Sequence, residues 1–374
     1  MAQPFIILTV SESGFHKEET HIFFTKKKKC SHMQKKTCIL RAFVVYFVHE
    51  NNVIGLREQN TKKEKMIFML LSTAHLQIIA DALDVTTDQI ENITLQKKGM
   101  SNHSFELTCK GQRYIFRIPG EGTDKFIKRE QEQQVYQVIA DKGFCDNPVY
   151  INAENGCKLA IFLDDVHVCN DDDIGELTQC MSLLRKLHNM KLQVDHTFDL
   201  YREINSYEAL WGERASYYDD YEITKKHVLD LKPVIDKYAK PMVLAHIDAN
   251  CDNYLFYKKG DGTKGLQLTD WEYAGMQDPD VDLAMFCIYS MYDRGRVDRL
   301  IDIYYEGECD ENTRTKIYCY IATCGLLWSN WCEYKKQLGV EFGEYAIRQY
   351  QYAKEYYDIV QERLLNVNNM KGGE

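Results

Sequence analysis

The apolar and polar positions of the chain follow a regular pattern from about residue 72. The stretch STAHLQIIADALDV places Leu76, Ile79 and Leu83 on one helical face. Ser72 or Thr73 is available to cap its start, so the pattern predicts a short helix. The following stretch, ITLQKKGMSNHSFELTCKGQRYIFRIPG, alternates apolar and polar residues around the turn signals KKGMSN and CKGQ. This alternation predicts consecutive antiparallel strands.

A second helical period follows these strands. In TDKFIKREQEQQVYQVIADKG, the residues Phe126, Ile127, Val135 and Ile139 fit one helix face, with Gly143 expected to close the helix. The segments PVYIN and KLAIFL then predict two further strands. Together these elements predict a small sheet with one long helix.

After DDVHVCNDDD the pattern becomes predominantly helical. The stretch IGELTQCMSLLRKLHNM has leucine and methionine at helical steps, and helical patterns resume near residues 220–238 and dominate from residue 279. The chain is long enough for two lobes that each bury a core. We therefore predict an α+β protein with a small antiparallel-sheet lobe at 66–167 and a larger, mainly helical lobe at 168–374.

Residues 1–65 differ from the rest of the chain. Their apolar runs follow no clear period, and they contain KKKK, NTKKEK and no Asp. Three interpretations of this basic extension stay open: a patch for nucleic acid or an acidic surface, a solvated and disordered tail, or a segment outside the working fold because translation begins at Met66.

Composition and charge narrow the class of protein. Apolar residues make up 45% of the chain and aromatic residues 12%, which indicates a compact globular protein. The net charge is -10, although residues 1–65 alone carry a surplus of positive charge. The acidic remainder argues against nucleic acid as a partner and suits a cationic ligand, although most of these carboxylates are expected on solvated surface.

The cysteines and apolar runs indicate a cytoplasmic protein with no stable membrane insertion. The 13 Cys are scattered without a CxxC pair, which favours neither a disulfide framework nor a zinc ribbon. The most apolar run, CILRAFVVYFV, is about half the length of a membrane span and contains Arg41. The start, MAQPFIILTVSESG, has no basic residues before its apolar run, so we expect no signal peptide.

The densest group of small polar residues is HIDANCDNYLF, at 246–256. The sequence that continues it, YLFYKKGDGTKGLQLT, predicts a β-hairpin with a Gly-Asp-Gly turn. Because a hairpin brings its ends together, Asn253 at its start and Asp270 after its finish should lie side by side. Asp248, in the preceding loop, should lie close to both.

This arrangement suits phosphoryl transfer. Asn253 and Asp270 can supply the protein's ligands to Mg²⁺, and Asp248 can orient a hydroxyl and accept its proton. The spacing His-x-Asp-x4-Asn is that of the protein-kinase catalytic loop. A metal-dependent hydrolase using His246, Asp248 and Asp270 would need further His ligands, which the neighbourhood does not offer. We expect His246 to brace the loop by hydrogen bonding.

From about residue 93 to 360 the chain resembles the choline/ethanolamine kinase family, close to its bacterial LicA-type branch. This family shares a protein-kinase-like fold with the aminoglycoside phosphotransferases. The stretch KGMSNHSFEL resembles the family's nucleotide loop, although a plain β-turn would explain it equally well. The resemblance implies that three of its residues lie near the ATP phosphates: Gly99, Ser101 and Asn102.

Three further motifs support the resemblance. YIFRIPG has Arg117 where the family places a basic residue that contacts phosphate. IKREQE resembles the family's Arg-x-x-Glu, which implies that Glu132 pairs with Arg117; an exposed pair between Arg129 and Glu132 is the alternative. DPDVDLAMF also resembles the family and implies that Asp282 holds the catalytic loop by hydrogen bonds.

The acceptor is predicted from the aromatic residues near the C-terminus. Trp328 and Trp331 of WSNW share a helix face and resemble the family's Trp-x-x-Trp segment. Aromatic faces attract quaternary ammonium, and Tyr273, Glu272 and Glu333 could complete such a site. The alternative is that these aromatic residues only pack in the core.

The sequence therefore predicts an ATP- and Mg²⁺-dependent kinase that converts choline, a small-molecule substrate, to phosphocholine. Ethanolamine stays open, since its primary ammonium can use the same carboxylate. A phosphotransferase for aminoglycosides or for another hydroxyl acceptor would have the same catalytic loop, so it also stays open. A catalytically dead binding protein of the same fold would have a broken catalytic set, whereas Asp248, Asn253 and Asp270 are all present in this sequence. The oligomeric state is not predicted.

Overall fold

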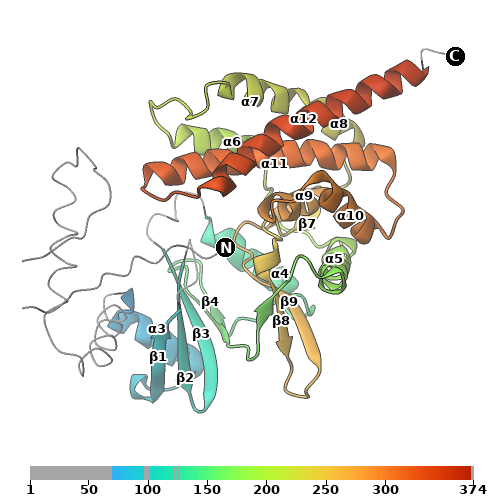
Figure 1. The fold of residues 1–374 in the computed structure, drawn as a ribbon. Helices are drawn as coiled ribbons and strands as arrows, with labels where there is room; N and C mark the ends of the chain where they lie inside the picture. The colour runs from blue at the N-terminus through green and yellow to red at the C-terminus, as the bar shows by residue number, and fades with distance from the viewer. Residues whose placement is uncertain (1–69, 97–101, 121–122, 124–126, 372–374) are drawn as a thin grey trace, which may run out of the picture. The chain divides into compact units, whose positions relative to one another are not determined.

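The computed structural model describes residues 70–96, 102–120, 123 and 127–371, with the side chains of 367–371 excepted. This part of the chain is α+β (Figure 1). Its elements, in chain order, are α3 (Thr73–Leu83), η1 (Thr87–Gln89), β1 (Ile90–Leu95), β2 (Asn102–Cys109), β3 (Gln112–Pro119), α4 (Arg129–Ile139), β4 (Tyr150–Ile151), β5 (Lys158–Ile161), β6 (His167–Val168), α5 (Ile174–Asn189), α6 (Leu200–Ala209), α7 (Tyr221–Asp230), α8 (Lys232–Tyr238), β7 (Val243–Ala245), η3 (Cys251–Asn253), β8 (Tyr254–Lys258), β9 (Lys264–Leu268), β10 (Gly275–Gln277), α9 (Asp280–Tyr289), α10 (Arg294–Tyr305), α11 (Glu311–Gln337) and α12 (Glu344–Lys371).

The elements from α3 to β5, which we call the N-lobe, include an antiparallel sheet of strand order β1-β2-β3-β5-β4. β2 and β3 are joined at Lys110 and Gly111, whose φ angles of 49° and 77° are those of a tight hairpin turn. The predicted CKGQ turn is thus confirmed. Phe105, Phe116 and Leu159, from three strands, are buried in a core that α3 covers.

The first predicted helix is confirmed, and the second is shorter than predicted. Ser72 caps α3 by accepting a hydrogen bond from the backbone N–H of His75. α4 begins at Arg129 because Lys128 is still extended, so Ile127 precedes the helix although its side chain is buried. Gly143 lies beyond the end of α4, and Phe126 lies outside the described residues. A buried apolar residue can lie in a helix or in an extended segment. The spacing of apolar residues therefore predicted a helix that is longer than α4.

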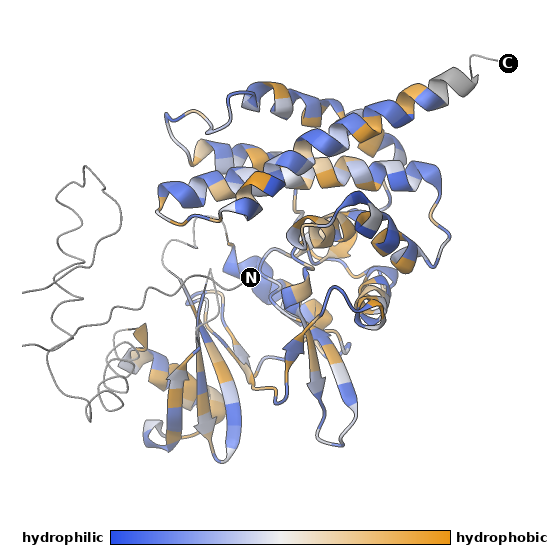
Figure 2. Cartoon of the chain, viewed as in Figure 1, coloured by the Kyte–Doolittle hydropathy of each residue, from blue (hydrophilic) through white to orange (hydrophobic). Residues whose placement is uncertain are grey.

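The elements from β6 onward, the C-lobe, are mainly helical and include two small sheets, β10-β7 and β6-β8-β9. α9 is apolar and buried along almost its whole length (Figure 2). α11 packs against α12, α9 and α6 in the larger of two hydrophobic cores. α4, which lies between β3 and β4 in the chain, also contributes Val135, Tyr136 and Ile139 to this core, so this N-lobe helix is anchored on the C-lobe.

Some predictions concern residues that the structure does not describe. Residues 1–65, Gly99 and Ser101 fall outside the described part of the chain, and the boundaries at 66 and 168 stay predictions. Across the described ranges, no helix combines the length and apolar character that a membrane span requires. The described cysteines are all free thiols. A cytoplasmic location stays a prediction.

Candidate active site

The predicted hairpin is present and brings the two ends of its sequence together. β8 and β9 pair along their length, and the N–H of Thr269 donates to the carbonyl of Asn253 over 2.9 Å. Asp270 therefore comes directly after Thr269, the residue that is hydrogen-bonded to Asn253. Asp270 has a left-handed backbone, with φ of 67°, which Asp tolerates better than most residues.

Asp248 lies in the loop between β7 and β8, where two amides hold its carboxylate. Oδ1 accepts from Asn250 Nδ2 over 2.7 Å, and Oδ2 accepts from Asn253 Nδ2 over 3.0 Å. Burial raises the pKa of Asp248 to about 7, although both hydrogen bonds oppose this rise. A carboxylate with a pKa near neutrality suits the transfer of a proton from a hydroxyl.

The loop that carries Asp248 is fastened to α9 through Asp282. The buried Asp282 carboxylate accepts from the backbone N–H of His246 over 2.9 Å and from that of Ile247 over 2.6 Å. Ile247 has φ of 70°, a strained conformation for a β-branched residue, and these bonds help to hold it. The predicted role of Asp282 as the residue that holds the loop is thus confirmed by its contacts.

His246 braces the loop from the other side, as predicted. Its side chain is fully buried, and burial lowers its pKa to about 4, so the imidazole is neutral. Nε2 lies 2.9 Å from the carbonyl oxygen of Thr269 and can donate to it. His246 therefore connects the loop to the base of the hairpin.

His188, on α5, is a further support that the sequence did not single out. Its Nε2 lies 2.9 Å from Asp282 Oδ2, and its Nδ1 lies 2.7 Å from the hydroxyl of Tyr304. Burial opposes ionisation of Asp282, but the hydrogen bond from His188 lowers the pKa of Asp282 below its usual value. The ionised carboxylate thus has donors on both oxygens, which fixes its orientation.

We expect His188→Leu to lower the free energy of unfolding by about 2 kcal/mol, because the buried Asp282 carboxylate then lacks one donor. The loosened loop should also lower kcat about tenfold. Urea unfolding and initial rates measure the two effects. His167→Leu, at an exposed histidine that contacts Glu176, is the matched control and should change the unfolding free energy by less than about 0.5 kcal/mol. Equal losses in both variants would contradict this role for His188.

Asn253 and Asp270 carry side-chain oxygen atoms of the kind that could hold a divalent cation. Asn253 uses Nδ2 to donate to Asp248, so its amide oxygen faces the other way. The Asp270 side chain is 39% exposed and accepts no hydrogen bond from the described residues; its nearest cation is Arg117, at 3.8 Å. Partial burial and the charge of Glu272 raise the pKa of Asp270. This concentration of oxygen atoms and negative charge fits Mg²⁺.

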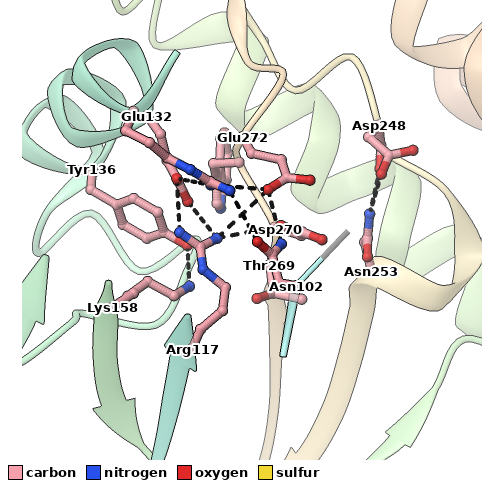
Figure 3. A network of polar contacts seen from close by, with 12 residues as sticks. Asn102, Arg117, Glu132, Tyr136, Lys158, Asp248, Asn253, Thr269, Asp270 and Glu272 are labelled. Carbon is pink, nitrogen blue, oxygen red and sulfur yellow. Dashed lines mark hydrogen bonds and ion pairs between the residues drawn. The ribbon is translucent and has the colours of Figure 1, made fainter. Parts of the chain in front are cut away.

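The predicted pair between Arg117 and Glu132 is formed and buried (Figure 3). The two side chains approach to 2.7 Å, and Arg117 Nη2 donates to Glu132 over 2.8 Å. Burial alone would raise the pKa of Glu132, but Arg117 and Arg129 lower it to about 2. Arg117 Nε is buried and has no hydrogen-bond partner among the described residues, which leaves a donor available to an anion.

The alternative pair, Arg129 with Glu132, is formed as well. Arg129 Nη1 donates to Glu132 over 2.7 Å, and its side chain is only 10% exposed, so the pair is not a surface contact. Lys158, which the sequence did not single out, is the cross-strand partner of Arg117 in β5 and pairs with Asp146 over 3.0 Å. In the sequence, the only indication of where Lys158 lies was the prediction of KLAIFL as a strand.

The predicted aromatic residues belong to a longer run of rings in contact. Tyr273, Trp328 and Trp331 are members, and sequence reasoning missed Phe198, Tyr289, Phe342 and Tyr345. The centroid distances are 6.3 Å for Phe198–Tyr273, 5.9 Å for Tyr273–Trp328, 5.3 Å for Trp328–Trp331, 4.9 Å for Trp331–Phe342, 6.3 Å for Phe342–Tyr345 and 6.1 Å for Tyr289–Tyr345. Tyr289 donates to the carboxylate of Asp252 over 2.7 Å, so the run is joined by a hydrogen bond to the loop that carries Asp248.

The two carboxylates expected at the acceptor differ in their contacts. Glu333 accepts from Ser216 Oγ over 2.7 Å and from the N–H of Tyr217 over 2.9 Å, so both its oxygens brace that segment. Glu272 uses one oxygen, Oε2, for contacts with Asn102 and Arg129. Glu272 thus has one carboxylate oxygen outside these contacts, whereas both oxygens of Glu333 are engaged; that either residue binds the acceptor stays a prediction.

These parts follow one another along the chain in the order found in protein-kinase-like phosphotransferases: a sheet with an Arg–Glu pair, a His-x-Asp-x4-Asn loop, and an Asp at the end of a hairpin. Comparison with known families narrows this class. The model of the choline/ethanolamine kinase family matches residues 93–322, more than half of the chain. The chain belongs to this family, whose members transfer a phosphoryl group to a hydroxyl acceptor.

Individual relatives include proteins named for different acceptors. The chain is 25% identical to protein LicA of Haemophilus influenzae over 272 residues, which cover 67% of this chain and 75% of LicA. It is 25% identical to a probable ethanolamine kinase of Nematostella vectensis over 295 residues, covering 68% and 81%. The crystal structure of choline kinase LicA from Streptococcus pneumoniae superposes with a TM-score of 0.64 at 24% identity, covering 75% and 98%. The relatives alone therefore do not choose between choline and ethanolamine.

Proposed function

We propose that this protein is an ATP- and Mg²⁺-dependent kinase that phosphorylates the hydroxyl of choline. The observation that carries the proposal is the half-buried carboxylate of Asp248, held by two amides in a loop to which Tyr289 of the aromatic run donates a hydrogen bond. The carboxylate can take the acceptor's proton, and the rings can bind its ammonium.

On the nucleotide side, the N-lobe supplies the groups that bind phosphate. Arg117 has a free buried donor, and Glu132 fixes the guanidinium in place. Asn102, at the start of β2, lies in the same network, next to the segment with Gly99 and Ser101 that the resemblance assigns to the phosphates. Mg²⁺ bound by Asn253 and Asp270 would neutralise the negative charge of the transferring phosphate.

In the reaction, the hydroxyl oxygen of choline attacks the γ-phosphorus of ATP. The bond between that phosphorus and the β–γ bridging oxygen breaks, ADP leaves, and the hydroxyl proton passes to the carboxylate of Asp248. Asn250 and Asn253 hold this carboxylate in position, while Asp282 holds the backbone that carries it. The chain thereby provides orientation and a proton acceptor, which are the main requirements of phosphoryl transfer.

Choline is favoured over ethanolamine by the number of aromatic rings. A quaternary ammonium is poorly hydrated and gains roughly 0.5–2 kcal/mol from each well-placed ring, whereas a primary ammonium needs hydrogen-bond acceptors. Tyr273, Trp328 and Trp331 supply rings, and Glu272 supplies one carboxylate oxygen. Ethanolamine is the second candidate, because its primary ammonium can bind that carboxylate. An aminoglycoside, which carries several ammonium groups, would need many more carboxylates.

A panel of acceptors tests this function. With Mg²⁺ and ATP, we expect ADP formation with choline, a kcat/KM about tenfold lower with ethanolamine, and no significant turnover with aminoglycosides. Trp328→Leu should raise the KM for choline more than that for ethanolamine. Tyr257→Leu, near the end of the hairpin strand β8, is a control for loss of an aromatic residue away from the site. Turnover confined to aminoglycosides, or absent with every acceptor, would refute the proposal.

A further inference from the structure

Arg129 forms a closed ring of hydrogen bonds with Asn102 and Glu272. Its Nη2 donates to Asn102 Oδ1 over 3.0 Å, and its Nη1 donates to Glu272 Oε2 over 3.1 Å. Asn102 Nδ2 completes the ring by donating to the same Glu272 oxygen over 3.0 Å. The three residues come from α4, from the start of β2, and from the segment after β9, so the ring joins three separated parts of the chain.

The ring is buried and well supported. The side chain of Arg129 is 10% exposed and that of Glu272 is 2% exposed. Gly156, with φ of +66°, packs so closely that an added Cβ would lie 3.3 Å from Arg129 and 2.5 Å from Pro119. α4 itself is anchored in the larger core. Arg129 is therefore fixed at its stem by packing and at its head by hydrogen bonds.

The ring also controls which way Glu272 faces. The contacts of Glu272 with Arg129 and Asn102 all use Oε2. In Figure 3 the other carboxylate oxygen of Glu272 points toward the side where Asp248 lies. Glu272 is two residues after Asp270, and its charge contributes to the raised pKa of both aspartates. A rotation of Glu272 would therefore change the electrostatic surroundings of the catalytic loop.

We propose that Arg129 is a positioning residue that sets Glu272 toward the acceptor's ammonium and ties the start of β2 to the segment that carries Asp270. Arg129 touches neither the acceptor nor the transferring phosphate. It acts through Glu272 and Asn102, and its fork geometry lets one guanidinium bond both, which a lysine ammonium cannot reproduce. This inference rests on the proposed function, since it assigns an acceptor with a cationic head.

A double-mutant cycle on the full-length protein tests the inference. Arg129→Gln and Glu272→Gln, alone and combined, are compared by the KM of choline, or of whichever amino alcohol the panel identifies. We expect each single change to raise that KM about tenfold and the double variant to be no worse than Glu272→Gln alone, since coupled residues do not add. Asn102→Ala, which leaves both charges in place, should raise it about threefold, and kcat should fall less than KM rises.

Further variants separate positioning from folding. Arg113→Gln is the matched control, because Arg113 also pairs with carboxylates of Glu106 and Asp164 but lies outside the ring; its KM should be unchanged. Arg129→Lys keeps the charge and loses the fork, so its KM should lie between those of wild type and Arg129→Gln. Fold-changes that multiply in the double variant, or a loss confined to kcat, would overturn the inference. Absence of turnover in the wild type would instead overturn the proposed function.

Discussion

Asp248→Asn should lower kcat with choline about 10³-fold, because an amide cannot take the proton of the attacking hydroxyl. The amide is close to the carboxylate in size, and one oxygen remains to accept from Asn250 or Asn253. The KM for ATP should therefore change by less than about threefold. Release of ADP under saturating ATP and choline measures the rate.

The loop offers its own control for this substitution. Asp252 lies four residues later, where its carboxylate accepts from the hydroxyl of Tyr289 over 2.7 Å. Asp252→Asn should keep kcat within about threefold of wild type, since no proton of the reaction is assigned to it. Full activity of Asp248→Asn would show that another group takes the proton.

Asp270→Asn should lower kcat/KM about 10²- to 10³-fold, because a negatively charged ligand is lost where charge develops during transfer. The Mg²⁺ concentration at half-maximal rate should rise more than tenfold. A titration with Mg²⁺ at constant ATP measures both quantities. Asp261→Asn, at the exposed tip of the same hairpin, is the matched control and should leave both unchanged.

Melting temperatures distinguish these losses from misfolding. The pKa values of Asp248 and Asp270 are raised, so the folded protein disfavours the charged form of each. Removing either charge should therefore leave the melting temperature unchanged or raise it. A variant that is inactive and also melts well below the wild type would not support a catalytic or metal-binding role for that residue.

The catalytic loop could be predicted because its parts are close in the sequence. Asp248, Asn253 and Asp270 span 23 residues, and a hairpin is a local structure whose ends must meet. The spacing of apolar residues predicted helices and strands for the same reason, because these elements are also local. α4 shows the limit, since the buried Ile127 fits the helical period yet precedes the helix.

Partners that are distant in sequence could not be predicted in the same way. From the sequence, Arg117 and Arg129 were alternative partners of Glu132. In the structure, both arginines donate hydrogen bonds to Glu132. Glu333 was expected at the acceptor, and the structure engages both its oxygens with a segment more than a hundred residues earlier. A sequence pattern reports the type of a side chain but not which distant group will satisfy it.

The sequence by itself determined the class of reaction, the α+β fold and the local arrangement of Asp248, Asn253 and Asp270, because these depend on spacing along the chain. Only the tertiary structure decided how the supporting residues are shared: His188 with Asp282, and Arg129 with both Asn102 and Glu272. Those contacts join residues up to 143 positions apart. They form because buried charges must find partners once the two cores have packed, and the packing determines which partners are within reach.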